Sequence, residues 1–423
     1  MKKLSKYIKW VLIIVTIFFT FQNSFSQQRF PKPEFENGYV QPDTTTPSPR
    51  AIAMEYIDVF ILLSLLSLAA WFVLKKRSRN GIFWISLFTL LYFGFYREGC
   101  VCTVGSIQNV ALTVFNSVYT IPITVLLFFL LPLFFSLFFG RVFCAGVCPL
   151  GVIQDLIILK PLSIPVWVRR TLGLIPFIYL GLAVLFAATD SDFIICRYDP
   201  FVGFFRLDGP FNMIILGIAF LVIGLFVARP YCRFLCPYGA LLKITSYFSK
   251  YHLSITPKDC IECKLCTNSC PFDAIETPTN SKFISNKPNQ VWRFIFFAAL
   301  IPLWIFIGGY AMSQMHRTLA LAHPNVYLTR LLTEQPELIK DTKDIEIQTF
   351  LSSGKTMDTL VSEAQMIEKR YYKGGWWLGS FLGLVFGWAL MNQAVFRKRT
   401  GYKPNKSDCY SCGRCMNYCP VKK

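Results

Sequence analysis

Two runs of cysteine in this chain share the spacing C-x2-C-x2-C-x3-C-P. The first run is Cys260, Cys263, Cys266 and Cys270, and the second is Cys409, Cys412, Cys415 and Cys419. Three thiolates at this spacing can wrap one iron–sulfur cube, whereas the fourth cysteine of such a run ligates the other cluster. The spacing therefore predicts two [4Fe–4S] clusters, each with three ligands from one run and a fourth from the other. The predicted sets are Cys260, Cys263, Cys266 and Cys419 for the first cluster, and Cys409, Cys412, Cys415 and Cys270 for the second. Zinc is the alternative, but zinc ribbons use separated C-x2-C pairs.

Four further cysteines form two C-x3-C-P pairs, Cys144 with Cys148 and Cys232 with Cys236. Residues four apart share one face of a helix, and the proline that follows suits the first turn of a new helix. Amide groups at such a helix start would stabilise a thiolate or an anionic cluster. We expect these four thiols to hold a further metal centre, which could be iron–sulfur, iron or copper. Buried reduced thiols or a disulfide switch are the alternatives.

The remaining three of the 15 cysteines are Cys100, Cys102 and Cys196. A C-x-C pair is too close for an easy intramolecular disulfide. Metal ligation with a fourth ligand that is not cysteine is therefore the favoured prediction. The alternative is one disulfide and one free thiol in an oxidising compartment.

The elements that must position these cysteines are membrane spans. The chain is 54% hydrophobic and only 16% charged, and several apolar runs are long enough to cross the roughly 30 Å hydrocarbon core. Seven spans are predicted, at 53–74, 81–96, 119–140, 172–189, 210–228, 291–309 and 374–396. The net charge of +19 comes largely from basic clusters that flank apolar runs. This pattern is typical of the positive-inside rule, so nucleic-acid binding is not expected.

The basic and apolar N-terminus predicts a secretory signal peptide over 1–26, and an uncleaved anchor helix is the alternative. Threading the chain from a periplasmic N-terminus then places both ferredoxin-like cysteine runs on the cytoplasmic face. The predicted organisation is a short periplasmic segment (27–52), a membrane core (53–256), a first ferredoxin part (257–290), a span (291–309), a periplasmic segment (310–373), a span (374–396) and a second ferredoxin part (397–423).

The membrane core contains an internal repeat. The stretch GRVFCAGVCPLG at 140–151 matches ARPYCRFLCPYG at 228–239, and each follows an apolar span. A two-unit repeat of this kind predicts a pseudo-twofold core with paired sites at its interface. The predicted fold class is therefore an all-α polytopic membrane protein with an internal repeat, together with a small α+β bacterial-type 2[4Fe–4S] ferredoxin module.

These motifs, with the stretches GCVCTVGSIQNV and CRYDPFVGFF, resemble the membrane polyferredoxins of the NosR and NapH type. The similarity covers roughly 55–423, and the C-terminal part is most similar to NosR. Members of that family are inner-membrane electron-transfer proteins, and NosR supports nitrous oxide reductase in the periplasm. NosR proteins also carry a periplasmic flavin-binding domain before the membrane core. Few residues precede the first span here, so covalent flavin is not expected.

The sequence and the resemblance together predict an inner-membrane protein that transfers electrons to a periplasmic reductase system, for which nitrous oxide reduction is the expected process. A quinol or a cytoplasmic donor would supply the electrons, and nitrous oxide reductase or a flavoprotein would be the periplasmic partner. The alternative is a copper-handling, maturation or sensor protein for a periplasmic metalloenzyme. The sequence contains no recognisable substrate-converting site, so the chain is interpreted as an electron-transfer subunit.

Overall fold

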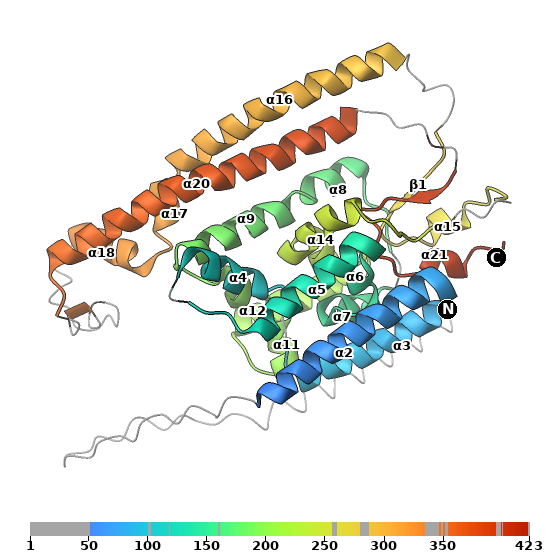
Figure 1. Ribbon diagram of the computed structural model, residues 1–423, viewed down its shortest axis with the longest axis horizontal. Helices are drawn as coiled ribbons and strands as arrows, with labels where there is room; N and C mark the ends of the chain where they lie inside the picture. The colour runs from blue at the N-terminus through green and yellow to red at the C-terminus, as the bar shows by residue number, and fades with distance from the viewer. Residues whose placement is uncertain are drawn as a thin grey trace. The chain divides into compact units, whose positions relative to one another are not determined.

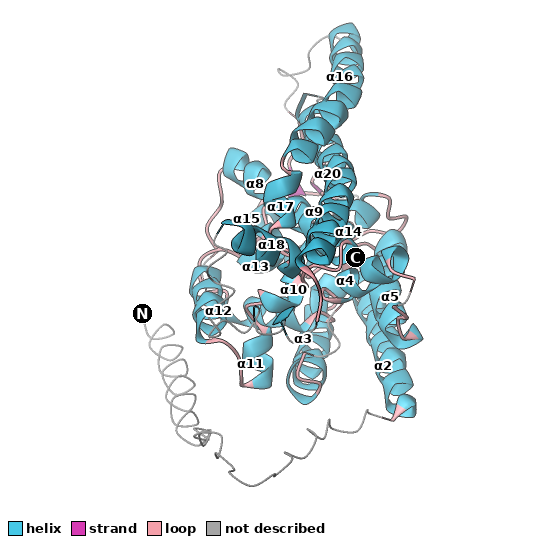
Figure 2. Ribbon diagram, turned by 90° about the vertical axis from the view of Figure 1, so that its left-hand side faces the viewer, coloured by secondary structure: helices cyan, strands magenta, loops and turns pink. Residues whose placement is uncertain are grey.

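The computed structural model describes residues 51–421, except 100–102, 118, 160, 256–259, 280–286, 335–346, 348–349, 352–353, 395–398 and 400. The predicted signal peptide, most of the predicted segment 27–52, Cys100 and Cys102 lie outside the described residues. In the described part of the chain nearly all regular structure is helical (Figure 2), which confirms the predicted helical class.

The N-terminal half of the described chain carries α2 (Ile52–Trp71), the π-helical η2 (Phe72–Lys76), α3 (Arg79–Thr89), the π-helical η3 (Leu90–Tyr96), α4 (Ser106–Phe115), α5 (Ile123–Phe139), α6 (Val142–Gly146), α7 (Pro149–Ile157), α8 (Val166–Leu172) and α9 (Ile175–Ala188). It continues with α10 (Ile194–Arg197), α11 (Val202–Arg206), α12 (Phe211–Gly224), α13 (Pro230–Phe234), α14 (Pro237–Tyr247) and α15 (Leu265–Asn268). The C-terminal half carries β1 (Ile275–Glu276), α16 (Lys287–Gln314), α17 (His316–Ala320), α18 (Pro324–Glu334), α20 (Met357–Ala394), β2 (Lys403–Pro404) and α21 (Arg414–Asn417).

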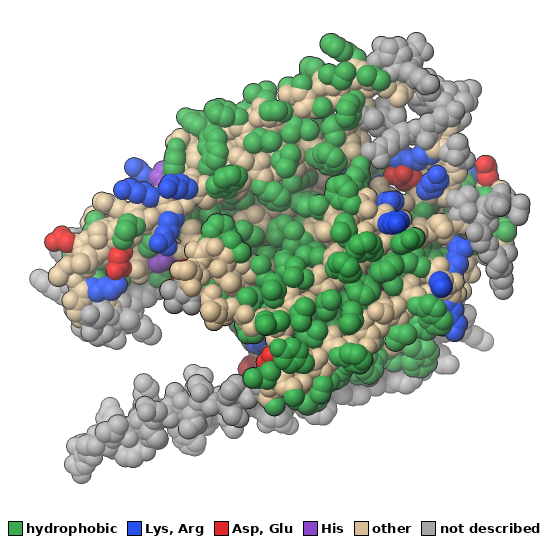
Figure 3. Space-filling model, in the orientation of Figure 1, with side chains coloured by type: hydrophobic (Ala, Val, Ile, Leu, Met, Phe, Trp, Pro, Cys, Tyr) green, Lys and Arg blue, Asp and Glu red, His purple; other side chains and the backbone are tan. Residues whose placement is uncertain are grey.

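Four helical stretches are long and apolar enough to cross a membrane. They are Ile52–Lys76, Val166–Ala188, Gln290–Gln314 and Met357–Ala394. The predicted spans 119–140 and 210–228 coincide with the shorter apolar helices α5 and α12, and 81–96 coincides with α3 and η3. Hydrophobic side chains cover the broad face shown in Figure 3, and charged side chains gather toward its two ends. This distribution fits a bilayer-embedded protein.

Helices α16 and α20 form a closely packed pair, seen side by side in Figure 1. Their contact is lined by glycine, and a Cβ added at Gly379 would overlap the backbone carbonyl of Gly308. Small residues allow two helix backbones to approach when lipid supplies no hydrophobic driving force. Helix α20 begins at Met357, well before the predicted span starts at 374. The polar residues that precede the apolar stretch are therefore also helical.

We predict that Gly379→Leu separates α16 from α20. The loss in free energy of unfolding should reach the upper end of the roughly 1–3 kcal/mol typical of overpacking, since the helix backbones must move apart. Thermal unfolding in detergent measures this loss. Gly224→Ala is the control, because a Cβ there would meet only Pro230 Cδ at 3.8 Å. Equal melting temperatures for Gly379→Leu and the wild type would contradict this packing.

The two C-x3-C-P motifs fold in the same way. In each, a short helix (α6 or α13) carries the first cysteine, and the second cysteine is the N-cap of the next helix (α7 or α14) with proline at its first turn. The expectation that each pair shares one helix face is therefore wrong. Proline disfavours helical backbone at the residue before it, so the chain breaks ahead of Cys148 and Cys236 and starts a new helix.

Both ferredoxin-like runs meet in one small module, although α16 and α20 separate them in the chain. Strands β1 and β2 pair antiparallel, with Ile275 opposite Pro404, and α15 contacts α21. Arg399 Nε lies 2.6 Å from a Glu276 carboxylate oxygen, which adds an ion pair between the two segments. The long α16–α20 hairpin thus returns the C-terminal tail to the first run (Figure 1).

Candidate metal centres

Cys260, Cys263, Cys266 and Cys419 line one hollow, together with Tyr402 and Ile255. The loop that carries the first three cysteines is bent by left-handed backbone on both sides of Cys263, at Glu262 (φ 52°) and Lys264 (φ 59°). Alternation of right- and left-handed residues turns successive amide N–H groups to one side and makes an anion-binding concavity. The loop therefore has the shape that a negatively charged cluster requires.

The second run repeats this backbone. Ser411 (φ 52°) and Gly413 (φ 72°) flank Cys412 as Glu262 and Lys264 flank Cys263. The backbone N–H of Ser411 lies 3.4 Å from Cys409 Sγ and donates to it. Of the four residues that flank Cys263 and Cys412 with positive φ, only Gly413 is glycine. The loop fold therefore imposes the left-handed backbone on residues that do not favour it.

Cys270 lies with the second run. Burial, together with the nearby thiols of Cys412 and Cys270, raises the pKa of Cys409 to about 12, although the hydrogen bond from Ser411 lowers it in part. Burial also raises the pKa of Cys415, with further contributions from Cys412, Cys409 and Cys270. Buried thiols that oppose each other's ionisation become thiolates only when a cation binds them. These four residues fit a [4Fe–4S] cluster, which supplies that charge.

The four thiols of the C-x3-C-P pairs, Cys144, Cys148, Cys232 and Cys236, border a common hollow. Gln154 Nε2 lies 3.3 Å from Cys232 Sγ, and the backbone N–H of Gly239 lies 3.3 Å from Cys236 Sγ. Burial raises the pKa of Cys232 to about 12, against the opposing effect of Arg229. Among the described residues, no three His, Cys, Asp or Glu side chains are arranged around a single metal ion.

Two buried arginines border the same hollow, Arg141 and Arg229. Their contacts are reciprocal between the repeats: Arg141 donates to the Gly239 carbonyl oxygen, and Arg229 donates to that of Cys144. Arg141 Nε and Arg229 Nη2 are buried without a hydrogen-bond partner among the residues that the structure describes. A cation buried beside four thiols favours an anionic centre, and a cluster with four thiolate ligands is anionic.

Asp155 joins the core to the second run. Its carboxylate lies 2.8 Å from Arg79, 3.2 Å from Arg414 and 3.5 Å from Arg229. Burial alone would raise the pKa of Asp155, but the three arginines hold it well below its usual range. Arg79 also donates to the Cys412 carbonyl oxygen at 2.8 Å. One buried carboxylate on α7 therefore ties together α3, the N-cap of α13 and α21.

We predict that Asp155→Asn loosens the C-terminal tail. Removing one partner of a buried ion pair typically costs about 3–5 kcal/mol, since the other charges stay buried. Loosening of the tail should appear as faster protease cleavage after residue 399 and as a lower temperature of thermal unfolding. Asp192→Asn is the matched control, because the Asp192–Arg197 pair is largely exposed and such pairs contribute less than about 1 kcal/mol. If both variants behaved alike, Asp155 would not anchor the tail.

Of the three outer cysteines, only Cys196 falls in the described residues. It is exposed on α10 and lines a cavity of about 300 Å³. The same cavity is bordered by the carboxylates of Asp58 and Asp199. Asp58 accepts hydrogen bonds from Tyr92 at 2.7 Å and pairs with Arg97 at 2.9 Å.

Sequence reasoning missed the polar residues around the thiols, namely Arg141, Asp155, Gln154, Arg229 and Tyr410. A signal was present for the two arginines, since each lies three residues before the first cysteine of its C-x3-C-P motif. Asp155 and Gln154 follow one motif and have no counterpart in the other, so the repeat could not indicate them.

Two family models match the parts of the chain that carry the core thiols and the first cysteine run. A family model described as a 4Fe-4S binding domain matches residues 121–175 and 209–256, which include both C-x3-C-P pairs. A second model with the same description matches 253–276, which includes the first cysteine run. The fold and these matches define a helical iron–sulfur protein of the polyferredoxin class with candidate membrane spans.

Three relatives show which polyferredoxins these are. An uncharacterized protein of Methanocaldococcus jannaschii is 30% identical over 47% of this chain and 82% of its own. Regulatory protein NosR of Stutzerimonas stutzeri is 30% identical over 47% of this chain and 29% of its own, and protein NirI of Paracoccus denitrificans is 28% identical over 53% and 35%. The chain belongs to the NosR/NirI-type polyferredoxins. It spans about a third of the length of the NosR and NirI relatives. No solved structure matches it.

Proposed function

We propose that this chain is an inner-membrane electron-transfer protein that carries electrons between two cytoplasmic [4Fe–4S] clusters and a centre in the membrane core, toward a periplasmic reductase system. The observation that carries the proposal is the arrangement of twelve cysteines around three hollows or clusters, two in the ferredoxin module and one in the core. When bound, iron–sulfur clusters would supply one-electron chemistry. The residues described here would hold them, tune them and keep water out.

The burial of the cysteines supports an order for the three sites. Cys260 and Cys263 of the first run are exposed, so this site is open to a soluble partner. Cys409, Cys412 and Cys415 are buried, at 7–8% exposure, and the loop around them contacts the core through Arg79 and Arg414. The second site therefore lies between the first site and the core.

A seven-span topology with the ferredoxin module in the cytoplasm is part of the proposal. Its support is the coincidence of each predicted span with a helix and the basic clusters beside the cytoplasmic ends. The spans impose a gap of about 30 Å, so transfer across it needs intermediate sites. The core thiols, and Cys196 beside the outer cavity, supply candidates along that path.

The family supports a proposal for the periplasmic partner. The relatives include proteins named regulatory protein NosR and putative electron transport protein YccM. We infer nitrous oxide reductase, or another reductase of denitrification, as the acceptor system. The word regulatory in the name of NosR also supports the second candidate, a sensor or metal-maturation protein that uses the same thiols.

The test is iron, acid-labile sulfide and copper analysis with low-temperature EPR on anaerobically purified chain. We expect clearly more than about eight iron atoms per chain and a signal beyond two interacting [4Fe–4S] clusters. About eight irons without a further centre would leave the core thiols without a redox role. Copper bound at those thiols would favour the maturation function.

We also predict that Cys419→Ser damages the cluster held by Cys260, Cys263 and Cys266, since its thiol borders that hollow. Cys415→Ser should instead damage the second cluster. EPR of the two variants, with iron content, separates them by the loss of different signals. Loss of the second cluster alone in Cys419→Ser would contradict the assignment.

A further inference from the structure

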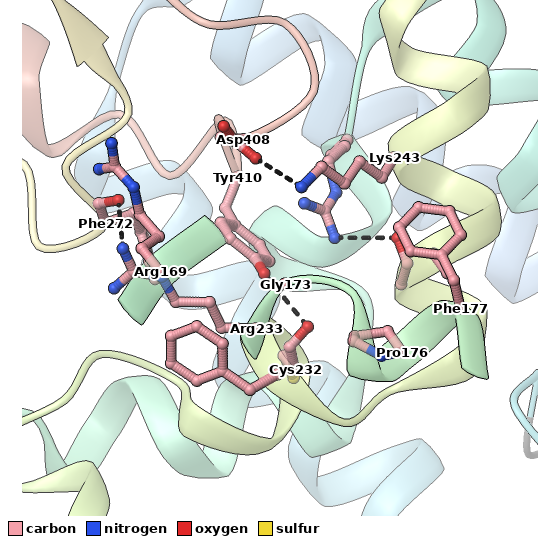
Figure 4. A pocket seen from close by; sticks show the side chains of 14 residues that line it. Arg169, Gly173, Pro176, Phe177, Cys232, Arg233, Lys243, Phe272, Asp408 and Tyr410 are labelled. Atoms are coloured by element: carbon pink, nitrogen blue, oxygen red, sulfur yellow. Dashed lines mark hydrogen bonds and ion pairs between the residues drawn. The ribbon is translucent and has the colours of Figure 1, made fainter. Parts of the chain in front are cut away.

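Tyr410 lies where the second cysteine run meets the membrane core. It follows Cys409 in the chain, and its side chain is only 4% exposed. Its hydroxyl donates a hydrogen bond to the backbone carbonyl oxygen of Cys232 at 3.2 Å. Figure 4 shows the ring pointing from the tail toward Cys232. One side chain thus joins a residue of the second run to a residue of the core thiol group.

The ring of Tyr410 is held from two further directions. The guanidinium carbon of Arg141 lies 4.1 Å from the ring centroid, a cation–π contact. The ring of Phe272 lies with its centroid 4.5 Å away, and Phe272 follows closely after Cys270. Lys243 pairs with Asp408 at 3.1 Å and fixes the adjoining backbone to α14 (Figure 4). The tyrosine is therefore fixed in position by both the module and the core.

We propose that Tyr410 is the positioning residue through which the second ferredoxin site exchanges electrons with the core thiols. The inference rests on the proposed function. The path runs along covalent bonds from Cys409 through the Tyr410 ring, crosses one hydrogen bond, and continues along the backbone of Cys232. One site is oxidised by one electron as the other is reduced, and Tyr410 keeps its proton and its oxidation state.

The other links between the module and the core are less direct. Asp155 reaches the second run at Arg414, which precedes Cys415, and Arg79 reaches it at the Cys412 carbonyl oxygen. These residues connect to a core cysteine residue only through Arg229, which pairs with Asp155 and donates to the Cys144 carbonyl oxygen. Among the hydrogen bonds that the structure describes, that of Tyr410 is the one that connects a residue adjoining a second-run cysteine directly to a core cysteine residue. Its loss should weaken electronic contact without moving the two sites.

The experiment compares Tyr410→Phe with the wild type and with Tyr179→Phe, using the full chain purified anaerobically with its clusters. Tyr410→Phe keeps the ring and its contacts with Arg141 and Phe272 and removes only the hydroxyl. Tyr179→Phe is the matched control, because the hydroxyl of Tyr179, in α9, also donates to a backbone carbonyl oxygen, that of Ile194, at 3.2 Å. The first readout is the rate of internal electron transfer after rapid photoreduction. The second readout is the spin–spin interaction between the second cluster and the core centre, which reports their separation.

We expect Tyr410→Phe to slow internal transfer several-fold with unchanged iron, sulfide and spin–spin interaction, and Tyr179→Phe to match the wild type. A wild-type rate in Tyr410→Phe would overturn the proposal. Loss of iron or of the spin–spin interaction in Tyr410→Phe would also overturn it, because Tyr410 would then be a structural residue. Failure of the proposed function appears separately, as a wild-type protein with no redox centre at the core thiols.

Discussion

The structure depends on the burial of positive charge beside buried thiols. Arg141 and Arg229 have side chains almost removed from solvent at the hollow that the four core cysteines border. A buried guanidinium is costly unless negative charge lies close to it. Asp155 supplies part of that charge for Arg229, and thiolates with their metal would supply the rest. The proposed anionic centre at the four core thiols would balance this buried positive charge.

The same arginines connect the core thiol site to the C-terminal tail. Arg229 pairs with Asp155, which also holds Arg414 of the C-terminal tail, and Arg141 lies against Tyr410 of that tail. The charge that suits the core site thus also docks the ferredoxin module onto it.

The α16–α20 hairpin solves a problem of chain geometry. The two cysteine runs must meet, yet a pair of long apolar helices lies between them in the chain. Close glycine contact at Gly308 and Gly379 keeps these helices antiparallel and together, so the chain returns to the side from which it left. The pairing of β1 with β2 then completes the module.

The sequence by itself determined the local features: the spacing of each cysteine run, the apolar segments, the repeat and the resemblance to NosR-type polyferredoxins. These follow from short-range periodicity and ligand spacing, which do not need the fold. The prediction that Cys144 and Cys148 share a helix face failed because the following proline acts on the backbone before it. Only the tertiary structure decided that Asp155 joins three arginines, that Tyr410 reaches Cys232, and that the second run is buried while the first is open. Such pairings join residues far apart in the chain, and burial, which gives them their strength, is a property of the packed molecule.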